Sequence, residues 1–354
     1  MSKATRLIGL DPGFGGVKLA EVQDHDIVTS VLPSVVGVGT LDSGALSLGG
    51  VVRGRREAQP YRVGFEGVEY LVGQNVAQYA RPIERMDFDR FTDGPELRAL
   101  FYAALYQLLD GGGHKVALAV GLPVEILQDK ARAQRVERNM SAWLVGRHQF
   151  TLDDTPAEFE IVKVRAKIAQ PVATWFAWGL DLDGQWCRGA KAAKAPALVI
   201  DQGFNTLDLL VVEGGRISTR YTGGDALGMR RAAEMAAGKV LQRYGVELSL
   251  HEADDLVRRV VSGKRAEVYV EGEPVEVTPQ VRQAINAAGA DVVRFVERNV
   301  GKGRKFKVLL TGGGALALAD RLLRQYPHAE VVEDPVLSNA RGLAKLAARA
   351  GFLV

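Results

Sequence analysis

The chain of 354 residues is long enough to form two domains, each with a hydrophobic core of its own. Apolar residues make up 47% and charged residues 25%, as in soluble globular proteins, and a formal net charge of +3 is too small to indicate nucleic-acid binding by itself. Cys187 is the only cysteine, which excludes an intramolecular disulfide and a cysteine-based zinc site. Since no stretch approaches the roughly 20 apolar residues that cross a bilayer, we expect a cytoplasmic protein without a membrane partner.

The first predicted element is a β-hairpin close to the N-terminus. An apolar run over residues 7–10 ends at Asp11 and Gly13, and a second apolar run begins at Val17. Glycine permits a tight turn whose backbone N–H groups approach an anion closely, and an aspartate at a strand end can hold a divalent cation through water. A single copy of this pattern is more often an ordinary turn than a phosphate site.

Strand and helix patterns then alternate, which indicates an α/β protein. Residues 31–64 are rich in Gly, Ser and Arg and lack periodicity, so we expect exposed loops there. The later patterns predict a hairpin over 61–72, a helix over 95–109, a strand over 116–122, a helix over 124–145 and a strand over 161–168. Gln170 opens an apolar helix that runs from Pro171 to Leu180, with proline where a first helical turn tolerates it.

The hairpin pattern returns in the second half of the chain. An apolar run over residues 198–200 ends at Asp201 and Gly203, and another apolar run covers 209–212. Asp201 follows Asp11 by 190 residues. Because two copies open two halves of one chain, together they predict a clamp on a metal-bound polyphosphate.

Two glycine-rich signals follow the second hairpin. Gly223 and Gly224 lie in a predicted turn that leads into a helix over 229–244, and a further hairpin is expected over 268–277.

Near the C-terminus, Gly312–Gly314 end a predicted buried strand over 307–311, and we expect a helix from Leu316. Small residues at such a point let backbone lie flat against a planar ligand, or let a helix pack closely on a sheet. Ser338 or Asn339 is expected to cap a C-terminal helix.

These patterns, in this order and spacing, resemble the actin-like ATPase superfamily, and within it the ParM-type plasmid-segregation proteins and their archaeal relatives. The five segments that carry the resemblance are Asp11–Lys18, Gln170–Gly179, Asp201–Asp208, Leu309–Ala315 and Asn339–Ala344. The resemblance implies a two-domain actin-like, ribonuclease H-like α/β fold with small inserted subdomains and a nucleotide cleft between the domains.

The same resemblance implies the domain boundaries. Residues 1–169 would form domain I, with an inserted subdomain at about 33–92 and the C-terminal helix, about 338–354, packed back on it. Residues 170–337 would form domain II, with an inserted subdomain at about 240–278.

The resemblance also implies roles for individual residues. Gln170 would orient the attacking water, because its amide can donate and accept hydrogen bonds, while Asp11 and Asp201 would hold Mg²⁺ through water. The residues implied to contact ATP or ADP are Gly13, Phe14, Gly15, Gly16, Lys18, Gly203, Phe204, Asn205, Thr206, Gly223, Gly224, Gly312, Gly313 and Gly314. Among these, the glycine pair and triplet would face ribose and adenine. Phe204 and Asn205 depart from the small residues that are frequent in the family.

The function implied by the resemblance is ATP hydrolysis coupled to assembly of the chain into filaments, with a DNA-bound adaptor protein linking filament ends to a plasmid. The basic stretches 53–56 and 302–307 are expected to be solvated loops, so direct nucleic-acid binding is not expected. Two alternatives remain: a small-metabolite kinase on the same fold, which would use a carboxylate base, and a non-polymerising, chaperone-like ATPase.

Overall fold

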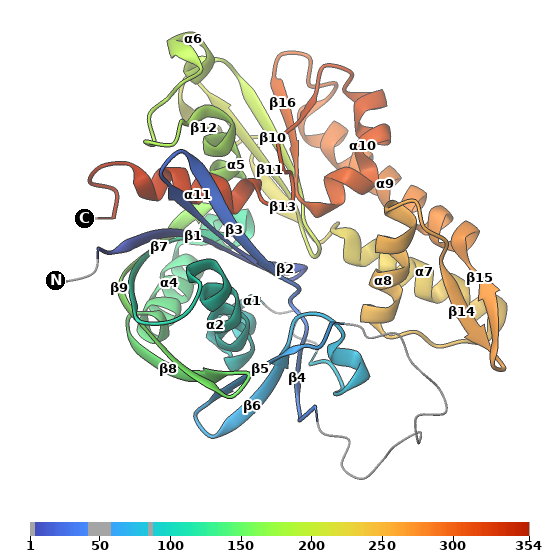
Figure 1. The fold of residues 1–354 in the computed structure, drawn as a ribbon. Coiled ribbons are helices and arrows are strands. Elements are labelled where there is room, and N and C mark those ends of the chain that lie inside the picture. Colours follow the sequence, from blue (N-terminus) through green and yellow to red (C-terminus); the bar gives the residue numbers. More distant parts are fainter. Residues whose placement is uncertain (1–3, 42–57, 84–87, 354) are drawn as a thin grey trace.

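In a computed structural model that describes residues 4–41, 58–83 and 88–353, two β-sheets lie on either side of two central helices (Figure 1). The basic stretch 53–56 and part of the first inserted segment lie outside the described residues. None of the helices in the described ranges combines the length and the apolar character that a membrane span requires.

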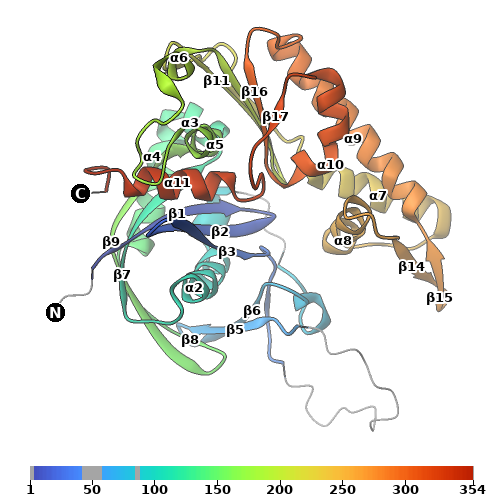
Figure 2. The same ribbon diagram turned by 45° about the horizontal axis from the view of Figure 1, so that its top comes forward.

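Among the described residues, the first sheet has nine strands and wraps around helix α2, Pro95–Leu109 (Figure 2). In spatial order its strands are β3 (Asp26–Leu32), β2 (Gly16–Gln23), β1 (Arg6–Gly13), β7 (His114–Leu122), β9 (Thr155–Ala169), β8 (Gly146–Leu152), β5 (Tyr61–Phe65), β6 (Val68–Val72) and β4 (Val36–Val38). β1 runs antiparallel to β2 and parallel to β7. The largest hydrophobic core of this half lies between these strands and α2, which contributes a nearly continuous buried surface.

The second sheet repeats the start of the first. Its strands are β12 (Arg216–Ile217), β11 (Leu207–Glu213), β10 (Ala197–Gln202), β16 (Lys307–Thr311) and β17 (Glu330–Val331), with β13 (Gly223–Asp225) paired to β11. β10 is antiparallel to β11 and parallel to β16, as β1 is to β2 and β7. The predicted α/β fold with two related halves is confirmed.

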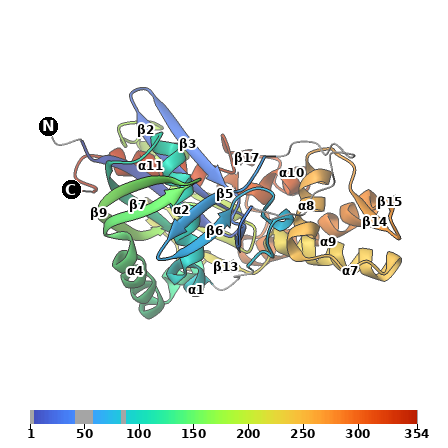
Figure 3. The same ribbon diagram turned by 60° about the horizontal axis from the view of Figure 1, so that its bottom comes forward.

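Helices and a small hairpin complete the second half. Its core is formed with helices α7 (Met229–Tyr244), α8 (Leu250–Val261), α9 (Thr278–Val300) and α10 (Gly313–Gln325). The hairpin of β14 (Glu267–Val270) and β15 (Glu273–Glu276) stands at the outer edge of this lobe (Figure 3). Shorter helices elsewhere are η1 (Val76–Gln78), α1 (Phe88–Asp93) and α6 (Gly189–Lys194).

The two central helices, α5 (Gln170–Gly179) and α11 (Ser338–Ala348), pack closely on each other. A Cβ atom added at Gly342 would lie only 1.7 Å from the carbonyl oxygen of Ala173, so glycine is required there for the backbones to approach. α11 contacts β1, β2 and β7, and α5 contacts β10, β11 and β16. The C-terminal helix therefore rests on the first sheet although it follows the second one in the chain.

Several local expectations were wrong. The helix expected over 124–145 is two helices, α3 (Val124–Gln128) and α4 (Lys130–Leu144), because Asp129 adopts an extended backbone and caps α4 through the amides of Ala131 and Arg132. Helix α10 begins at Gly313, three residues before the expected start at Leu316.

Two further corrections concern glycine and capping residues. Gly223 and Gly224 form a short strand, β13, rather than a turn, because their backbone pairs with β11. Neither Ser338 nor Asn339 caps α11, whose N-cap residue is Leu337; both side chains are buried in contacts with other elements.

Candidate functional site

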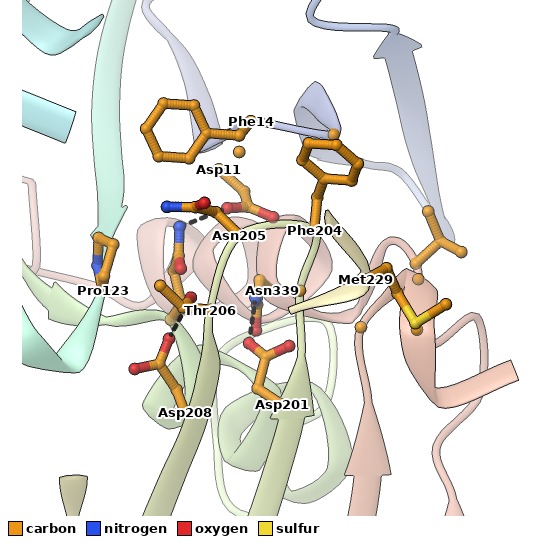
Figure 4. A pocket seen from close by; sticks show the side chains of 18 of the residues that line it. Asp11, Phe14, Pro123, Asp201, Phe204, Asn205, Thr206, Asp208, Met229 and Asn339 are labelled. Carbon is orange, nitrogen blue, oxygen red and sulfur yellow. Dashed lines mark hydrogen bonds between the residues drawn. The ribbon is translucent and has the colours of Figure 1, made fainter. Parts of the chain in front are cut away.

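A cavity of about 630 Å³ lies between the two halves, at the ends of β1 and β10 (Figure 4). Two turns face it: the first loop, Gly13–Gly16, and the second loop, Gly203–Thr206. The start of α10 and one face of α8 close its other sides. Of the predicted site residues, those that line it are Asp11, Gly13, Phe14, Gly15, Lys18, Gln170, Asp201, Gly203, Phe204, Asn205, Thr206, Gly312, Gly313 and Gly314.

Asp11 is held from two sides on the floor of the cavity. Gln170, the first residue of α5, donates its side-chain amide to Asp11 Oδ1 over 2.8 Å. Lys18 donates to Asp11 Oδ2 over 2.9 Å, from the position directly opposite in the pairing of β1 with β2. The carboxylate is buried and its charge is balanced by the ammonium group, so its orientation is fixed before any ligand binds.

Asp201 occupies the matching position at the end of β10. The amide of Asn339, near the start of α11, donates to Asp201 Oδ2 over 2.8 Å. Burial raises the pKa of Asp201 to about 6, with the negative charge of Asp11 adding to the effect and the Asn339 hydrogen bond opposing it. Each central helix thus presents one amide side chain to one of the two aspartates.

Asp208 is a third carboxylate in the same cavity. It lies directly opposite Asp201 in the β10–β11 pairing, and its Oδ2 accepts a hydrogen bond from Thr206 Oγ1 over 3.1 Å. Its Oδ1 is buried and has no hydrogen-bond partner among the described residues. Burial, followed by the negative charge of Asp201, raises the pKa of Asp208 to about 7.

The second loop has backbone amides that are available to bind a ligand. Its carbonyl groups are occupied, because Gly203 and Phe204 accept hydrogen bonds from Met229 and Arg230 at the start of α7. The Gly203 amide donates to the Thr206 carbonyl over 2.9 Å and is therefore used within the turn. Within the described part of the chain, the amides of the other three loop residues donate to no acceptor; these residues are Phe204, Asn205 and Thr206. Three unpaired N–H groups at a cavity wall suit an anion such as a phosphate.

The three consecutive glycines at the start of α10 differ in what surrounds them. Gly312 has φ +86°, and a Cβ there would lie 2.3 Å from the Gln202 carbonyl oxygen. At Gly314 a Cβ would meet the side chains of Gln202 and Met229, whereas at Gly313 it would meet nothing within 4 Å. Gly312 and Gly314 therefore allow close packing against neighbouring residues. Gly313 instead leaves one uncovered backbone position at the cavity.

Helix α8 contributes a cavity wall that the sequence did not reveal. Arg258 and Asp254 form an ion pair with an N–O distance of 2.6 Å, and both line the cavity. A Cβ built at Gly15 would lie 3.7 Å from Arg258 Nη2, so this side chain reaches from the second half of the chain to the first loop. The Ser249–Glu252 capping box marks the start of α8 in the sequence, but nothing in the sequence shows which way the helix faces.

Three predicted site residues do not line the cavity. Gly16 begins β2 and packs towards Leu32. Gly223 and Gly224 lie in β13, where a Cβ at Gly224 would be 2.5 Å from Asp208 Oδ1. The glycine pair therefore makes room for a buried carboxylate and lies outside the residues that line the cavity, so its expected contact with ribose and adenine stays a prediction.

Two protein-family models match the chain. The N-terminal domain of actin-like proteins matches residues 9–172, and the C-terminal domain of the archaeal MreB-like actin homologues matches residues 199–324. The two matches come in the order of the two halves described above. The chain is an actin-like protein.

Solved structures of actin homologues share the fold of this actin-like protein along its length. The archaeal actin homologue Ta0583 in complex with ADP has a TM-score of 0.70 at 16% identity, over 97% of this chain and 99% of that one. A 15-stranded ParM filament from Clostridium botulinum gives 0.74 at 16% identity, over 98% and 99%. Bacillus thuringiensis ParM with AMPPNP gives 0.63 at 14% identity, over 97% and 98%. A search of curated proteins by sequence gave no match.

Proposed function

We propose that this actin-like protein binds Mg²⁺–ATP in the cavity, hydrolyses it and assembles into filaments in a nucleotide-dependent way. The observation that carries the proposal is the pair of matching aspartates, Asp11 and Asp201, which end equivalent strands of the two halves and face one cavity. Unpaired amides of the second loop lie beside them. This arrangement suits a phosphate chain with an associated cation.

The residues present fit Mg²⁺. Asp11, Asp201 and Asp208 supply only oxygen ligands, and a buried Asp208 Oδ1 without a partner in the described structure is suited to a water molecule of a hydrated ion. Among the described residues, no three His, Cys, Asp or Glu side chains are arranged to hold a metal ion by themselves. Bound Mg²⁺ would neutralise charge on the transferred phosphate, and water and phosphate oxygens would complete its coordination.

The chain's own residues then have distinct roles in the proposal. The second loop would bind phosphate oxygens through its backbone amides. Lys18 would hold Asp11 in place as well as contact phosphate. Gln170 would orient the attacking water while its amide remains on Asp11. Arg258 would close the cavity over the nucleotide from the α8 side.

The proposal of filament assembly rests on the similar solved structures rather than on the geometry of the cavity. One of the similar structures is that of a ParM filament, and others contain ADP or AMPPNP. By the same analogy, a DNA-bound adaptor protein would link filament ends to a plasmid, and the protein would act in the cytoplasm.

A small-metabolite kinase is the second candidate, because Asp208 gives the cavity a carboxylate of the kind that would deprotonate an acceptor hydroxyl. The test that separates the two functions measures phosphate release from ATP without any acceptor, together with right-angle light scattering and pelleting after ATP–Mg²⁺ addition. We expect phosphate release with a rise in scattering and a pellet. Hydrolysis without scattering or a pellet at any protein concentration would refute the filament, and ATP turnover only with an added sugar or metabolite would favour the kinase.

A further inference from the structure

A cluster of buried polar side chains lies where α5, α11 and β16 meet, beside the cavity. We call it the polar cluster, and its members are Thr174, Thr311, Ser338 and Asn339. Of these residues only Asn339 lines the cavity. The three hydroxyl groups therefore lie behind the cavity wall, where they do not contact a ligand.

Thr174, on α5, is at the centre of the polar cluster. Its Oγ1 lies 2.7 Å from Asn339 Oδ1. The same atom lies 2.9 Å from Ser338 Oγ and 3.2 Å from Thr311 Oγ1. Ser338 and Thr311 also form a hydrogen bond with each other, and both reach the Pro335 carbonyl oxygen. One side chain of α5 thus contacts both α11 and β16.

The chemistry of these groups fixes the direction of one hydrogen bond. Asn339 Oδ1 carries no proton and can only accept, so the Thr174 hydroxyl group donates to it. On its other side, the Asn339 amide nitrogen donates to Asp201 Oδ2. If the amide were turned over, its oxygen would face the ionised carboxylate and the two acceptors would repel each other. Thr174 therefore favours the one amide orientation that can donate to Asp201.

Helix α5 reaches both aspartates of the site. Gln170 and Thr174 are four residues apart, which places them on the same face of the helix. Gln170 donates directly to Asp11. Thr174 donates to Asn339, which in turn donates to Asp201. One helix face therefore orients one aspartate directly and the other through a residue of α11.

Packing of the central helices does not by itself require a hydroxyl group at position 174. Valine has the shape of threonine, and a buried hydroxyl group costs free energy unless it forms hydrogen bonds. Gly342 already lets the backbones of α5 and α11 approach each other. What threonine adds at this position is a donor aimed at the Asn339 amide oxygen.

We propose that Thr174 is a positioning residue for the cation site: its hydroxyl group orients the Asn339 amide, and that amide orients Asp201. This inference rests on the proposed function, in which Asp201 holds Mg²⁺ through water. Thr174 acts through Asn339 because it does not line the cavity itself. Loss of its hydroxyl group should weaken the Mg²⁺-dependent part of ATP binding, while the residues that contact ATP remain in place.

The experiment compares two substitutions of Thr174 in the full-length protein. Thr174→Val keeps the shape of the side chain and removes the hydroxyl group, whereas Thr174→Ser retains the hydroxyl group. Thr278→Val is the matched control, because Thr278 is also buried and accepts a hydrogen bond from the Ala266 amide over 2.9 Å, outside the cavity lining. Calorimetry measures ATP binding over a range of Mg²⁺ concentrations, and chemical denaturation measures the stability of each variant.

We expect Thr174→Val to raise the Mg²⁺ concentration for half-maximal ATP binding about tenfold, as for other residues that orient a metal-binding group. Thr174→Ser should restore the wild-type requirement. Thr278→Val should lose stability without any change in the Mg²⁺ requirement. In the Asn339→Ala background, Thr174→Val should have no further effect on this requirement, because the group through which it acts is gone.

A second measurement needs no nucleotide. NMR of protein with isotope-labelled asparagine follows the side-chain NH₂ group of Asn339, which is identified by its absence from Asn339→Ala. In Thr174→Val its protons should exchange with solvent at least about tenfold faster than in the wild type, because the amide has lost the hydrogen bond that fixes it. The exposed side-chain amide of Asn299 should exchange equally in both proteins.

The possible negative results have different meanings. If the wild type shows no Mg²⁺-dependent ATP binding, the proposed function fails and the role of Thr174 at the cation site fails with it. A wild-type Mg²⁺ requirement in Thr174→Val, or equal losses in Thr174→Val and Thr174→Ser, would refute the positioning role alone. A further loss in the Asn339→Ala background, or unchanged exchange of the Asn339 amide, would show that Thr174 does not act through Asn339.

Discussion

Asp208 lies directly opposite Asp201 in the pairing of β10 with β11, at the place where the first half sets Lys18 opposite Asp11. The two hairpins therefore have the same geometry and opposite electrostatics: one pairs a carboxylate with an ammonium group, and the other pairs two buried carboxylates. Burial is the main cause that raises the pKa values of Asp201 and Asp208 to about 6 and about 7, with repulsion from Asp11 adding to it at Asp201 and repulsion from Asp201 adding to it at Asp208. A cation bound between the hairpins would relieve that repulsion.

The first prediction concerns stability and pH. A raised pKa of about 7 for Asp208 means that the folded protein holds a proton that the unfolded chain, with a pKa of about 4, releases. The contribution of Asp208 to the stability of the ligand-free protein is therefore most favourable below about pH 4 and decreases as the pH rises to 7. Asp208→Asn should flatten this slope and stabilise the ligand-free protein at pH 8 by about 2 kcal/mol, because it removes a buried charge.

Chemical denaturation at several pH values between 4 and 8 measures this effect. Asp225→Asn, at an exposed position in the neighbouring β13, is the matched control and should leave the slope unchanged. An Asp208→Asn variant with the wild-type slope would show that Asp208 ionises normally.

The second prediction concerns Asn339. Asn339→Ala removes the hydrogen bond to Asp201 and leaves that buried oxygen unpaired. We expect the Mg²⁺ concentration for half-maximal ATP hydrolysis to rise about 10- to 100-fold, as for other residues that orient a metal-binding carboxylate. Asn299→Ala, which removes an exposed side-chain hydrogen bond in α9, should have no such effect. An unchanged Mg²⁺ requirement would remove Asn339 from the site.

The third prediction concerns Gln170. Gln170→Ala should bind ATP with nearly wild-type affinity but hydrolyse it about 10- to 100-fold more slowly, because the attacking water and Asp11 both lose an orienting amide. Single-turnover phosphate release measures the step. Gln128→Ala, which removes an amide hydrogen bond to the Thr222 carbonyl outside the cavity lining, should retain full activity. Normal hydrolysis by Gln170→Ala would show that another group positions the water.

The fourth prediction tests the α8 wall. Arg258 lines the cavity and its neighbour Arg259 does not, although both are basic residues near the end of α8. Arg258→Ala should weaken ATP binding about tenfold, which corresponds to about 1.4 kcal/mol, while Arg259→Ala should change it little. Equal losses in a fluorescence titration would mean that only the general positive charge of α8 matters.

The fifth prediction tests the contact of the central helices. Gly342→Ala places a methyl group against the Ala173 carbonyl and should lower the free energy of unfolding by about 3 kcal/mol. Gly238→Ala, at an exposed position of α7 with nothing near the added methyl, should instead stabilise by about 0.5–1 kcal/mol. Similar denaturation midpoints for the two variants would contradict the close packing of α5 on α11.

Local signals in the sequence predicted elements whose ends depend on nearby residues. The helix over 95–109 was right at both ends, because Pro95 starts it and a run of glycines follows it. The helix over 229–244 was also right, since glycines bracket it. The break at Asp129 was missed, because the apolar spacing continues through a residue that caps the next helix.

The parts of the site that the sequence did not predict depend on contacts between distant segments. Asn339 was expected to be a cap, but it reaches Asp201, 138 positions away in the chain. Asp208 was visible in the second hairpin, yet its role follows from the strand register and from burial. The direction in which α8 points Arg258 is set by packing of the whole second half.

The most direct test of the central claim is a calorimetric titration of the protein with ATP, with and without Mg²⁺. The two hairpins should bind one ATP per chain, at least about tenfold more tightly when Mg²⁺ is present, because the cation relieves the repulsion among buried carboxylates and phosphates. Absence of ATP binding, or an affinity that Mg²⁺ leaves unchanged, would contradict the account.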